Sequence, residues 1–255
     1  MISENIYGHR KRLHWIVSHI NKSDTIVEFG CGTGYMISLP LAKMGYNIVG
    51  IDTDEESIAF GQEIFRKEGL DPNVLKAMDI SELNFVPDVV IASEVLEHIS
   101  DEELDKTLYF IRSKLVRGGR LFVTVPNGYG WFEMESFLWF KARLGILLKW
   151  LQITRAIKGL KHLFFGLDSK IPYYKYPSTL SGSAHVRRFT YWSIQRLLQS
   201  HGFEISDIAG SVLFAGELSD LLFTGIKPLM KFNCLLGNLF PVLASGFYVF
   251  SRSNN

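Results

Sequence analysis

The stretch "TIVEFGCGTGYM", residues 25–36, decides the fold. An apolar run that contains one acid, Glu28, comes first. Three glycines at alternate positions follow it: Gly30, Gly32 and Gly34. Glycine adopts left-handed backbone conformations that other residues avoid, and it lets a ligand approach the main chain closely. The stretch therefore predicts a strand that runs into a tight ligand-binding loop.

The spacing of these glycines separates three classes of nucleotide-binding loop. A phosphate-binding P-loop ends in Gly-Lys-Ser/Thr, whereas Gly34 is followed by Tyr35 and Met36. The dinucleotide fingerprint G-x-G-x-x-G, counted from Gly30, needs a glycine at position 35, where the chain has tyrosine. What remains is an acid-x-Gly-x-Gly-x-Gly loop. Its acid suits a ligand that carries positive charge and no pyrophosphate.

Strand-like apolar runs alternate with helical patterns around this stretch. The predicted strands are 25–30, 47–52, 73–79, 88–94 and 119–126, and the predicted helices are 35–45, 54–69 and 101–116. This alternation is typical of an α/β fold, a doubly wound parallel sheet with helices on both faces. In such sheets ligands bind beyond the carboxyl ends of the strands, so the functional residues are sought there.

Composition excludes several classes of protein. The 27 Lys and Arg nearly balance the 26 Asp and Glu, so no overall field favours nucleic acid. Two cysteines are too few for a disulfide framework, which predicts a reducing, cytoplasmic setting. The N-terminal twenty residues are charged throughout and predict an amphipathic helix, not a signal peptide. The uncharged segment 232–251 contains two Asn, two Gly and a Pro, which disfavours a membrane span.

Five motifs follow one another along the first half of the chain. They are "VEFGCGTG", "IVGIDTDEESI", "KAMDISEL", "DVVIASEVLEHI" and "LVRGGRLFVTVPN", and together they extend to residue 127. In this order they resemble the motifs of the class I S-adenosylmethionine-dependent methyltransferases. The resemblance implies a Rossmann-like, seven-stranded sheet whose final strand is antiparallel. The remaining core elements are then a helix over 190–202 and strands over 203–210 and 245–252.

On this basis we expect a single domain over 1–255. Residues 1–127 form the cofactor-binding half, and 185–210 with 245–252 complete the core. Two mainly helical apolar insertions, 128–184 and 211–244, interrupt it. The first is expected to act as a lid.

The resemblance also implies S-adenosylmethionine as the cofactor and assigns residues to it. The predicted cofactor-binding residues are Glu28, Gly30, Gly32, Gly34, Asp52, Thr53, Asp79, Ile80 and Glu94. Asp52 lies 20 residues after Gly32, where a carboxylate can accept hydrogen bonds from both ribose hydroxyls. Asp54 is the better candidate for the cap of the following helix.

The other cofactor candidates lie at two further strand ends. Asp79 and Ile80 resemble the pair that contacts adenine, although Asp79 alone is equally typical of a turn. Glu94 ends its strand and is expected to face the cofactor. Glu97 is expected to be a solvated residue of the next helical turn.

Two histidines are candidate general bases. His98 could take a proton from an acceptor hydroxyl, or it could pack and cap the following helix. "HVRRFT", residues 185–190, resembles a segment of small-molecule and glycan-pathway methyltransferases. It makes His185 the second candidate base and Arg187 or Arg188 the residue that holds an acidic group of the acceptor. Alternatively, these side chains pin the loop while Thr190 caps a helix.

The insertions are apolar. Residues 131–167 carry six Lys or Arg against two Glu, together with eight Trp or Phe. Bases mixed with aromatic residues are typical of an interfacial helix in lipid headgroups, and they also suit a lid that packs on the domain. The second insertion is apolar as well, with Lys227 and Lys231. Both favour a lipid-linked acceptor or peripheral contact with a membrane.

The sequence thus predicts a methyltransferase that methylates an oxygen of a small molecule, a sugar, a quinone-like phenol or a lipid-linked intermediate. Three alternatives are an N- or C-methyltransferase, a non-catalytic binding module and a nicotinamide oxidoreductase, the last disfavoured by Tyr35. A nucleic-acid substrate is not expected, because the fourth motif lacks the Asn/Asp-Pro-Pro-aromatic pattern of base methylation. The sequence contains no cluster of acids and histidines at the spacing of metal ligands, so a catalytic metal is not expected.

Overall fold

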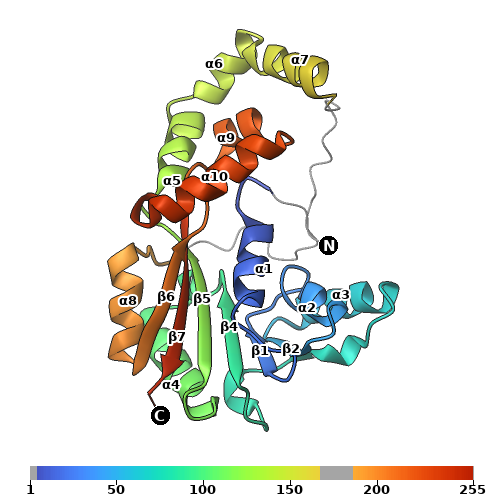
Figure 1. The fold of residues 1–255 in the computed structure, drawn as a ribbon, viewed down its shortest axis with the longest axis vertical. Coiled ribbons are helices and arrows are strands. Elements are labelled where there is room, and N and C mark those ends of the chain that lie inside the picture. Colours follow the sequence, from blue (N-terminus) through green and yellow to red (C-terminus); the bar gives the residue numbers. More distant parts are fainter. Residues whose placement is uncertain (1–4, 167–185, 255) are drawn as a thin grey trace.

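A computed structural model describes residues 5–166 and 186–254 of the chain. One sheet contains seven strands in the order β3-β2-β1-β4-β5-β7-β6 (Figure 1). The strands are β1 Thr25–Phe29, β2 Asn47–Asp52, β3 Leu75–Ala77, β4 Val89–Ser93, β5 Arg120–Pro126, β6 Phe203–Gly210 and β7 Gly246–Ser253. The first five run parallel, and β7 lies antiparallel between β5 and β6. The predicted fold class is confirmed.

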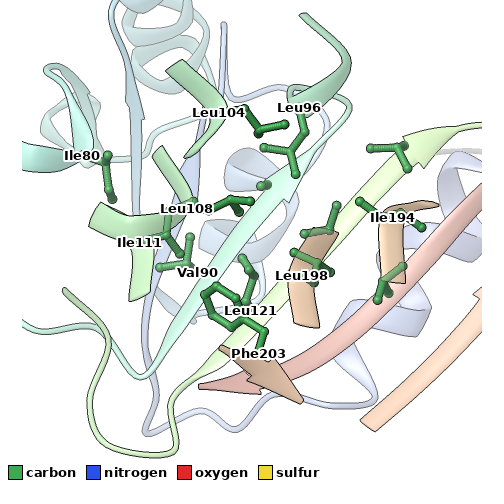
Figure 2. Close-up of a cluster of buried hydrophobic side chains, with 14 of the residues drawn as sticks. Ile80, Val90, Leu96, Leu104, Leu108, Ile111, Leu121, Ile194, Leu198 and Phe203 are labelled. Carbon is green, nitrogen blue, oxygen red and sulfur yellow. The ribbon is translucent and has the colours of Figure 1, made fainter. Parts of the chain in front are cut away.

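Both faces of the sheet are covered because its central strands are apolar on both sides. The core helices are α1 His9–Val17, α2 Ser38–Lys43, α3 Glu55–Lys67, α4 Asp101–Lys114 and α8 Tyr191–Ser200. Helices α1 and α2 pack on the face that carries Ile91 and Phe122. Helices α4 and α8 pack on the face that carries Val90 and Leu121 (Figure 2). This two-sided burial fixes the sheet, so the carboxyl ends of the strands form one rigid edge.

Two predicted elements are shorter in the structure by four or five residues. The helix predicted over 35–45 covers only α2, because the residues before Ser38 form turns of the glycine loop. The strand predicted over 73–79 is reduced to β3, because Pro72–Val74 forms a 3-10 turn, η1, capped by Asp71. A second 3-10 turn, η2 Ile80–Glu82, follows it.

Both insertions are helical in the parts that the structure describes. The first contains α5 Trp131–Ser136, the π-helical turn η4 Phe137–Lys141, α6 Leu144–Trp150 and α7 Ile153–Phe165. The second contains α9 Glu217–Phe223, α10 Lys227–Leu239 and the 3-10 turn η5 Pro241–Leu243. All of them lie at the end of the molecule opposite to the C-terminus, above the carboxyl edge of the sheet (Figure 1).

Substitution of Leu108 tests the packing of α4. Leu108 is fully buried between α4 and the sheet, whereas the adjacent Tyr109 is 65% exposed. Leu108→Ala is expected to lower the free energy of unfolding by about 2–5 kcal/mol, since it leaves a cavity. Tyr109→Ala should change it by less than about 0.5 kcal/mol. Urea unfolding measures both, and equal effects would contradict the assigned packing.

Candidate active site

The loop after β1 is built around Gly32 and Asp52. Gly32 has a φ of +52°, and no described atom lies within 4 Å of the position of an added Cβ. Its amide donates to Oδ2 of Asp52 at 2.7 Å, and the amide of Asp54 donates to Oδ1 at 2.9 Å. Each carboxylate oxygen has a second lone pair. Asp52 therefore retains lone pairs that ribose hydroxyls could use, and the cofactor contacts of Asp52 and of the exposed Thr53 stay predictions.

The other two glycines of the loop are held by packing. An added Cβ on Gly30 would lie 2.4 Å from Cγ2 of Val95, and one on Gly34 would lie 2.8 Å from Cδ2 of Leu75. Both have positive φ, which side chains rarely adopt. They give the loop its shape, whereas Gly32 faces open space.

Glu28 lies beneath the loop and is 4% exposed. Its Oε2 accepts hydrogen bonds from the amide of Ser38 at 2.8 Å and from the hydroxyl of the same residue. Burial raises the pKa of Glu28 to about 7, although the bonds from Ser38 oppose this rise. In the structure Glu28 thus fixes the start of α2, and its contact with a cofactor stays a prediction.

Asp79 and Ile80 follow β3. The carboxylate of Asp79 accepts from the amide of Ser81 at 2.8 Å, and Glu82 accepts from the amide of Asp79 at 2.7 Å. Together they form a capping box for η2. Ile80 is 1% exposed and packs in the core beside α4 (Figure 2). The adenine contact predicted for this pair stays a prediction.

Glu94 directly follows β4 and has a left-handed conformation, with φ of 56°. Its amide donates to the carbonyl of Thr124 at 2.8 Å, and Thr124 Oγ1 donates to Glu94 Oε1 at 2.9 Å. Arg12 of α1 places Nη1 3.3 Å from the same Oε1. A left-handed non-glycine residue is strained, and such strain is concentrated at functional sites. The carboxylate is held at the edge of the sheet by a hydroxyl and a buried guanidinium.

A pocket of about 190 Å³ opens beside Glu94. It is lined by Tyr7, His9, Arg12, Glu94, Pro126, Phe132, Ser211, Ala215, Ser245, Gly246 and Tyr248. These residues come from the N-terminal segment, the ends of β4 and β5, both insertions and the start of β7. The pocket thus lies where α/β sheets bind ligands, beyond the strand ends.

The sequence did not identify His9, Arg12 or Tyr248 as residues of the site. Arg12 is 6% exposed, and its Nε has no hydrogen-bond partner among the described residues. The charge pattern of the N-terminal segment indicated only that it forms an amphipathic helix. A buried arginine in the middle of its apolar face would have been the available signal, but its partners on β4 and β5 are set by tertiary packing.

The prediction of a solvated Glu97 is wrong. Glu97 lies in the 3-10 turn η3 Leu96–His98 and is 1% exposed. The turn folds inward because Leu96 packs in the core, and this buries its neighbour. No described group donates a hydrogen bond to either carboxylate oxygen of Glu97, and His98 Nε2 lies 4.0 Å from Oε1. Burial, with the charge of Glu94 adding to it, raises the pKa of Glu97 to about 9.

The "HVRRFT" segment returns the chain to this edge of the sheet. The amides of Val186 and Arg187 donate to the carbonyl of Glu97 at 3.0 and 3.2 Å. The guanidinium of Arg187 forms an ion pair with Asp101. These contacts pin the loop, as one of the two predicted alternatives required.

The other predicted residues of this segment have different outcomes. Arg188 lies 3.8 Å from Glu133 of α5 and is mostly exposed. Thr190 caps α8 as predicted, accepting from the amide of Ser193 at 3.1 Å. His185 lies outside the described residues. Binding of an acidic group by Arg187 or Arg188, and the catalytic roles of His98 and His185, stay predictions.

The methyltransferase domain family matches residues 5–208 of this sequence. The chain belongs to the methyltransferase domain family. The match includes the five strand-end motifs and excludes the second insertion and β7.

Curated relatives of this methyltransferase match about two fifths of the chain. The ubiquinone biosynthesis O-methyltransferase of Rhizobium etli is 34% identical over 105 residues, which are 40% of this chain and 41% of that protein. The mitochondrial ubiquinone biosynthesis O-methyltransferase of Homo sapiens is 32% identical over 111 residues, 40% of this chain and 28% of that protein. The match therefore spans well under two thirds of these relatives.

Solved structures share the fold at low identity. Magnesium protoporphyrin IX methyltransferase from Synechocystis, crystallised with bound SAH, has a TM-score of 0.55 and 18% identity, covering 96% of this chain and 81% of that one. The [4+2]-cyclase SpnF has a TM-score of 0.58 and 16% identity over the same shares. Since a cyclase shares the fold, these likenesses show architecture alone.

The family assignment confirms three predictions: the methyltransferase class, its enzymatic nature and S-adenosylmethionine as the family's cofactor. The acceptor and the roles of individual residues are not tested by these likenesses.

The buried Glu97 predicts a pH-dependent stability. Its pKa is 4.5 in model peptides and about 9 in the fold, so the unfolded chain loses this proton first as pH rises. The free energy of unfolding of the wild type, relative to Glu97→Gln, is expected to fall between about pH 5 and pH 9. Urea unfolding at several pH values measures it.

Glu102→Gln, which changes an exposed acid of α4, controls for the loss of one charge. A difference between wild type and Glu97→Gln that stays constant with pH would contradict the raised pKa.

Proposed function

We propose that this chain transfers a methyl group from S-adenosylmethionine to an oxygen of a small aromatic acceptor. The observation that carries the proposal is the pocket lined by the paired Arg12 and Glu94, which opens beyond the carboxyl ends of β4 and β5, while the glycine loop follows the neighbouring β1 of the same sheet. In this arrangement the loop holds the nucleoside end of the cofactor. The pocket then receives its reactive end together with the acceptor.

The residues present fit the cofactor. Gly32 leaves open space above the loop, and Asp52 has lone pairs for the ribose. Arg12 Nε is a buried donor without a described partner, which a carboxylate would satisfy. Glu94 supplies the complementary negative charge for an ammonium group. An arginine and a glutamate side by side thus match the zwitterionic amino-acid end of S-adenosylmethionine.

The pocket lining favours an aromatic acceptor. Tyr7, Phe132 and Tyr248 contribute three rings to an opening of modest volume. Rings pack against planar aromatic ligands through stacked or edge contacts. The relatives are O-methyltransferases of ubiquinone biosynthesis, which supports a phenol over a sugar or another lipid-linked intermediate.

The cofactor supplies an electrophilic methyl group when it is bound. This chain's contribution is to place the acceptor oxygen in line with that group, and such positioning is worth roughly 7–11 kcal/mol of the barrier. The side chains of both insertions that line the pocket would shield the reacting groups from water. His98 or His185 would remove the proton of a hydroxyl acceptor.

Binding of the product analogue S-adenosylhomocysteine tests the cofactor site. At about 100 times its dissociation constant, the ligand should stabilise the fold by about 2.7 kcal/mol. That corresponds to a rise in Tm of about 5–10 °C. Asp52→Ala should lose this rise because the ribose loses its acceptor.

Asp71→Ala is the matched control, since Asp71 caps η1 away from the loop. Its Tm should still rise with the ligand. A wild-type protein whose Tm does not respond would contradict the proposal.

Methyl transfer tests the reaction itself. Incubation with S-adenosylmethionine labelled in its methyl group and with catechol is expected to give a labelled methyl ether. A sugar and a lipid-linked saccharide serve as the competing acceptor classes. Labelling of the sugar alone would contradict the aromatic acceptor, and cofactor binding without turnover on any acceptor would favour a non-catalytic binding module.

We also propose that the two insertions contact an anionic membrane surface. Trp150, Leu163 and Phe164 are 71–76% exposed on α6 and α7, and Leu235 and Phe232 of α10 are more than half exposed. The exposed bases around them are Lys141, Arg143, Lys149, Arg155, Lys158, Lys227 and Lys231. Apolar side chains flanked by bases suit the boundary between acyl chains and anionic headgroups.

The geometry of the second insertion is consistent with a surface contact. No helix in the described part of the chain has the length and apolar character needed to cross a bilayer. The uncharged segment 232–251 is divided among α10, η5 and β7.

Vesicle co-sedimentation tests the surface contact. The protein should bind phosphatidylglycerol vesicles more strongly than phosphatidylcholine vesicles, because the bases are attracted to anionic lipid. Phe164→Glu should weaken binding about tenfold, since it removes an exposed ring that would be buried among the lipids when the protein binds. Tyr109→Glu on α4 is the control and should leave binding unchanged. Equal loss in the two variants would contradict the assigned surface.

A further inference from the structure

Phe132, on the first helix of the first insertion, lines the pocket together with Tyr7 of the N-terminal segment. The centroids of the two rings lie 6.4 Å apart at an interplanar angle of 67°, which is an edge-to-face contact. The two residues are far apart in the sequence. Their contact therefore joins the N-terminal segment to the first insertion at the pocket.

The helical turn that carries Phe132 is held in place by its neighbours. Trp131 packs edge to face on Phe214, with ring centroids 4.8 Å apart, and its Nε1 donates to Oε1 of Glu135 at 2.5 Å. Glu135 is 3% exposed and accepts from the amide of Leu218 at 3.1 Å. The residues on both sides of Phe132 are thus anchored to the second insertion.

The ring of Tyr7, which Phe132 contacts, is also held. It stacks on His9 with a centroid distance of 5.9 Å and an interplanar angle of 28°. The residue between them, Gly8, accepts a hydrogen bond at its carbonyl from the hydroxyl of Tyr248 at 3.1 Å. The N-terminal segment is therefore fixed to β7 at the point where it supplies Tyr7 to the pocket.

The second insertion and the start of β7 contribute only small side chains to the pocket. These residues are Ser211, Ala215, Ser245 and Gly246. Their main chain is tied down, since the amide of Ser211 donates to the carbonyl of Gly246 at 2.9 Å and the amide of Ser245 donates to that of Val212 at 2.8 Å. Small side chains on a hydrogen-bonded main chain have little to move aside for a ligand. The width of the pocket therefore depends on its larger side chains.

The volume of the pocket limits the size of an aromatic ligand. A cavity of about 150 Å³ holds one benzene ring. The pocket has a volume of about 190 Å³, which exceeds this by too little for a second fused ring. A larger acceptor would therefore need the space of one of the lining rings.

Among these rings, Phe132 is the one that can be removed at least cost to the fold. Tyr248 is 2% exposed, and its hydroxyl donates to the main chain. Phe132 is only partly buried, and its side chain has no polar atom whose hydrogen bond could be lost. Its truncation thus enlarges the pocket without leaving a buried polar group unpaired.

We infer that Phe132, held against Tyr7, sets the size limit of the pocket and restricts it to acceptors with one aromatic ring. This inference rests on the proposed function, because it takes the pocket to be the acceptor site. Phe132 is then a residue of specificity. It excludes a larger acceptor by contact and takes no part in proton transfer.

Substitution of Phe132 tests the size limit through the choice between two acceptors. One is catechol, and the other is the naphthalene diol that carries the same adjacent hydroxyls away from the ring junction. The wild type should have the higher kcat/KM for catechol. Phe132→Ala removes more atoms than the second ring adds, so the ratio of the two kcat/KM values should shift toward the naphthalene diol by about tenfold. Phe132→Leu should give a smaller shift.

Tyr129→Ala is the matched control. Tyr129 is 73% exposed in the turn before α5 and is not among the residues that line the pocket. Its substitution should leave the ratio as in the wild type. A variant that merely loses stability lowers both kcat/KM values alike, so the ratio separates a size limit from a structural role.

The affinity for S-adenosylhomocysteine is measured in the same series and should be unchanged in the variants. A wild type that binds no S-adenosylhomocysteine, or that methylates neither diol, would contradict the proposed function, and the inference would fall with it. Normal binding of that ligand and methylation of catechol, with a ratio that Phe132→Ala leaves unchanged, would overturn only the inference. A wild type that methylates the naphthalene diol as well as catechol would also overturn only the inference.

Discussion

The buried guanidinium of Arg12 is the contact on which the site depends. It reaches from α1 to Thr124 Oγ1 at 3.5 Å and to Glu94 at 3.3 Å, and so joins the N-terminal helix to the ends of two central strands. A buried charge is costly unless it is paired. The pairing with Glu94 offsets this cost and also holds the strained turn at the end of β4. Without Arg12, the pocket would lose one of its lining side chains, and the carboxylate of Glu94 would lose the guanidinium that holds it.

The two insertions both contribute residues to the lining of this pocket, and helix-end contacts join them to each other. Glu135 of α5 is buried and accepts from the amides of Leu218 and Ser219 at 3.1 and 3.0 Å, at the start of α9. Lys161 of α7 donates to the carbonyl of Thr224 at 2.9 Å, at the end of α9. An acid at the N-terminus and a base at the C-terminus of one helix both complement its dipole. The first insertion thus holds the second.

The sequence was informative where local chemistry decides structure. The glycine spacing, the acids at strand ends and the alternating apolar runs predicted the sheet, and Asp54 caps α3 and Thr190 caps α8 as expected. It was not informative where distant parts meet. Glu97 was predicted to be solvated because charged side chains are mostly exposed. The packing of Leu96, which buries its neighbour Glu97, is visible only in the folded core. Arg12 was missed because its partners, Glu94 and Thr124, lie at the ends of β4 and β5. His9 was missed because the pocket that it lines is assembled from distant parts of the chain.

A crystal structure of the complex with S-adenosylhomocysteine tests the central claim, that the glycine loop and the Arg12–Glu94 pair bind the two ends of one cofactor. The account predicts ribose hydroxyls within hydrogen-bond distance of Asp52 and the amino-acid carboxylate beside Arg12, with the sulfur facing the pocket. A ligand bound elsewhere, or one whose carboxylate lies away from Arg12, would contradict it.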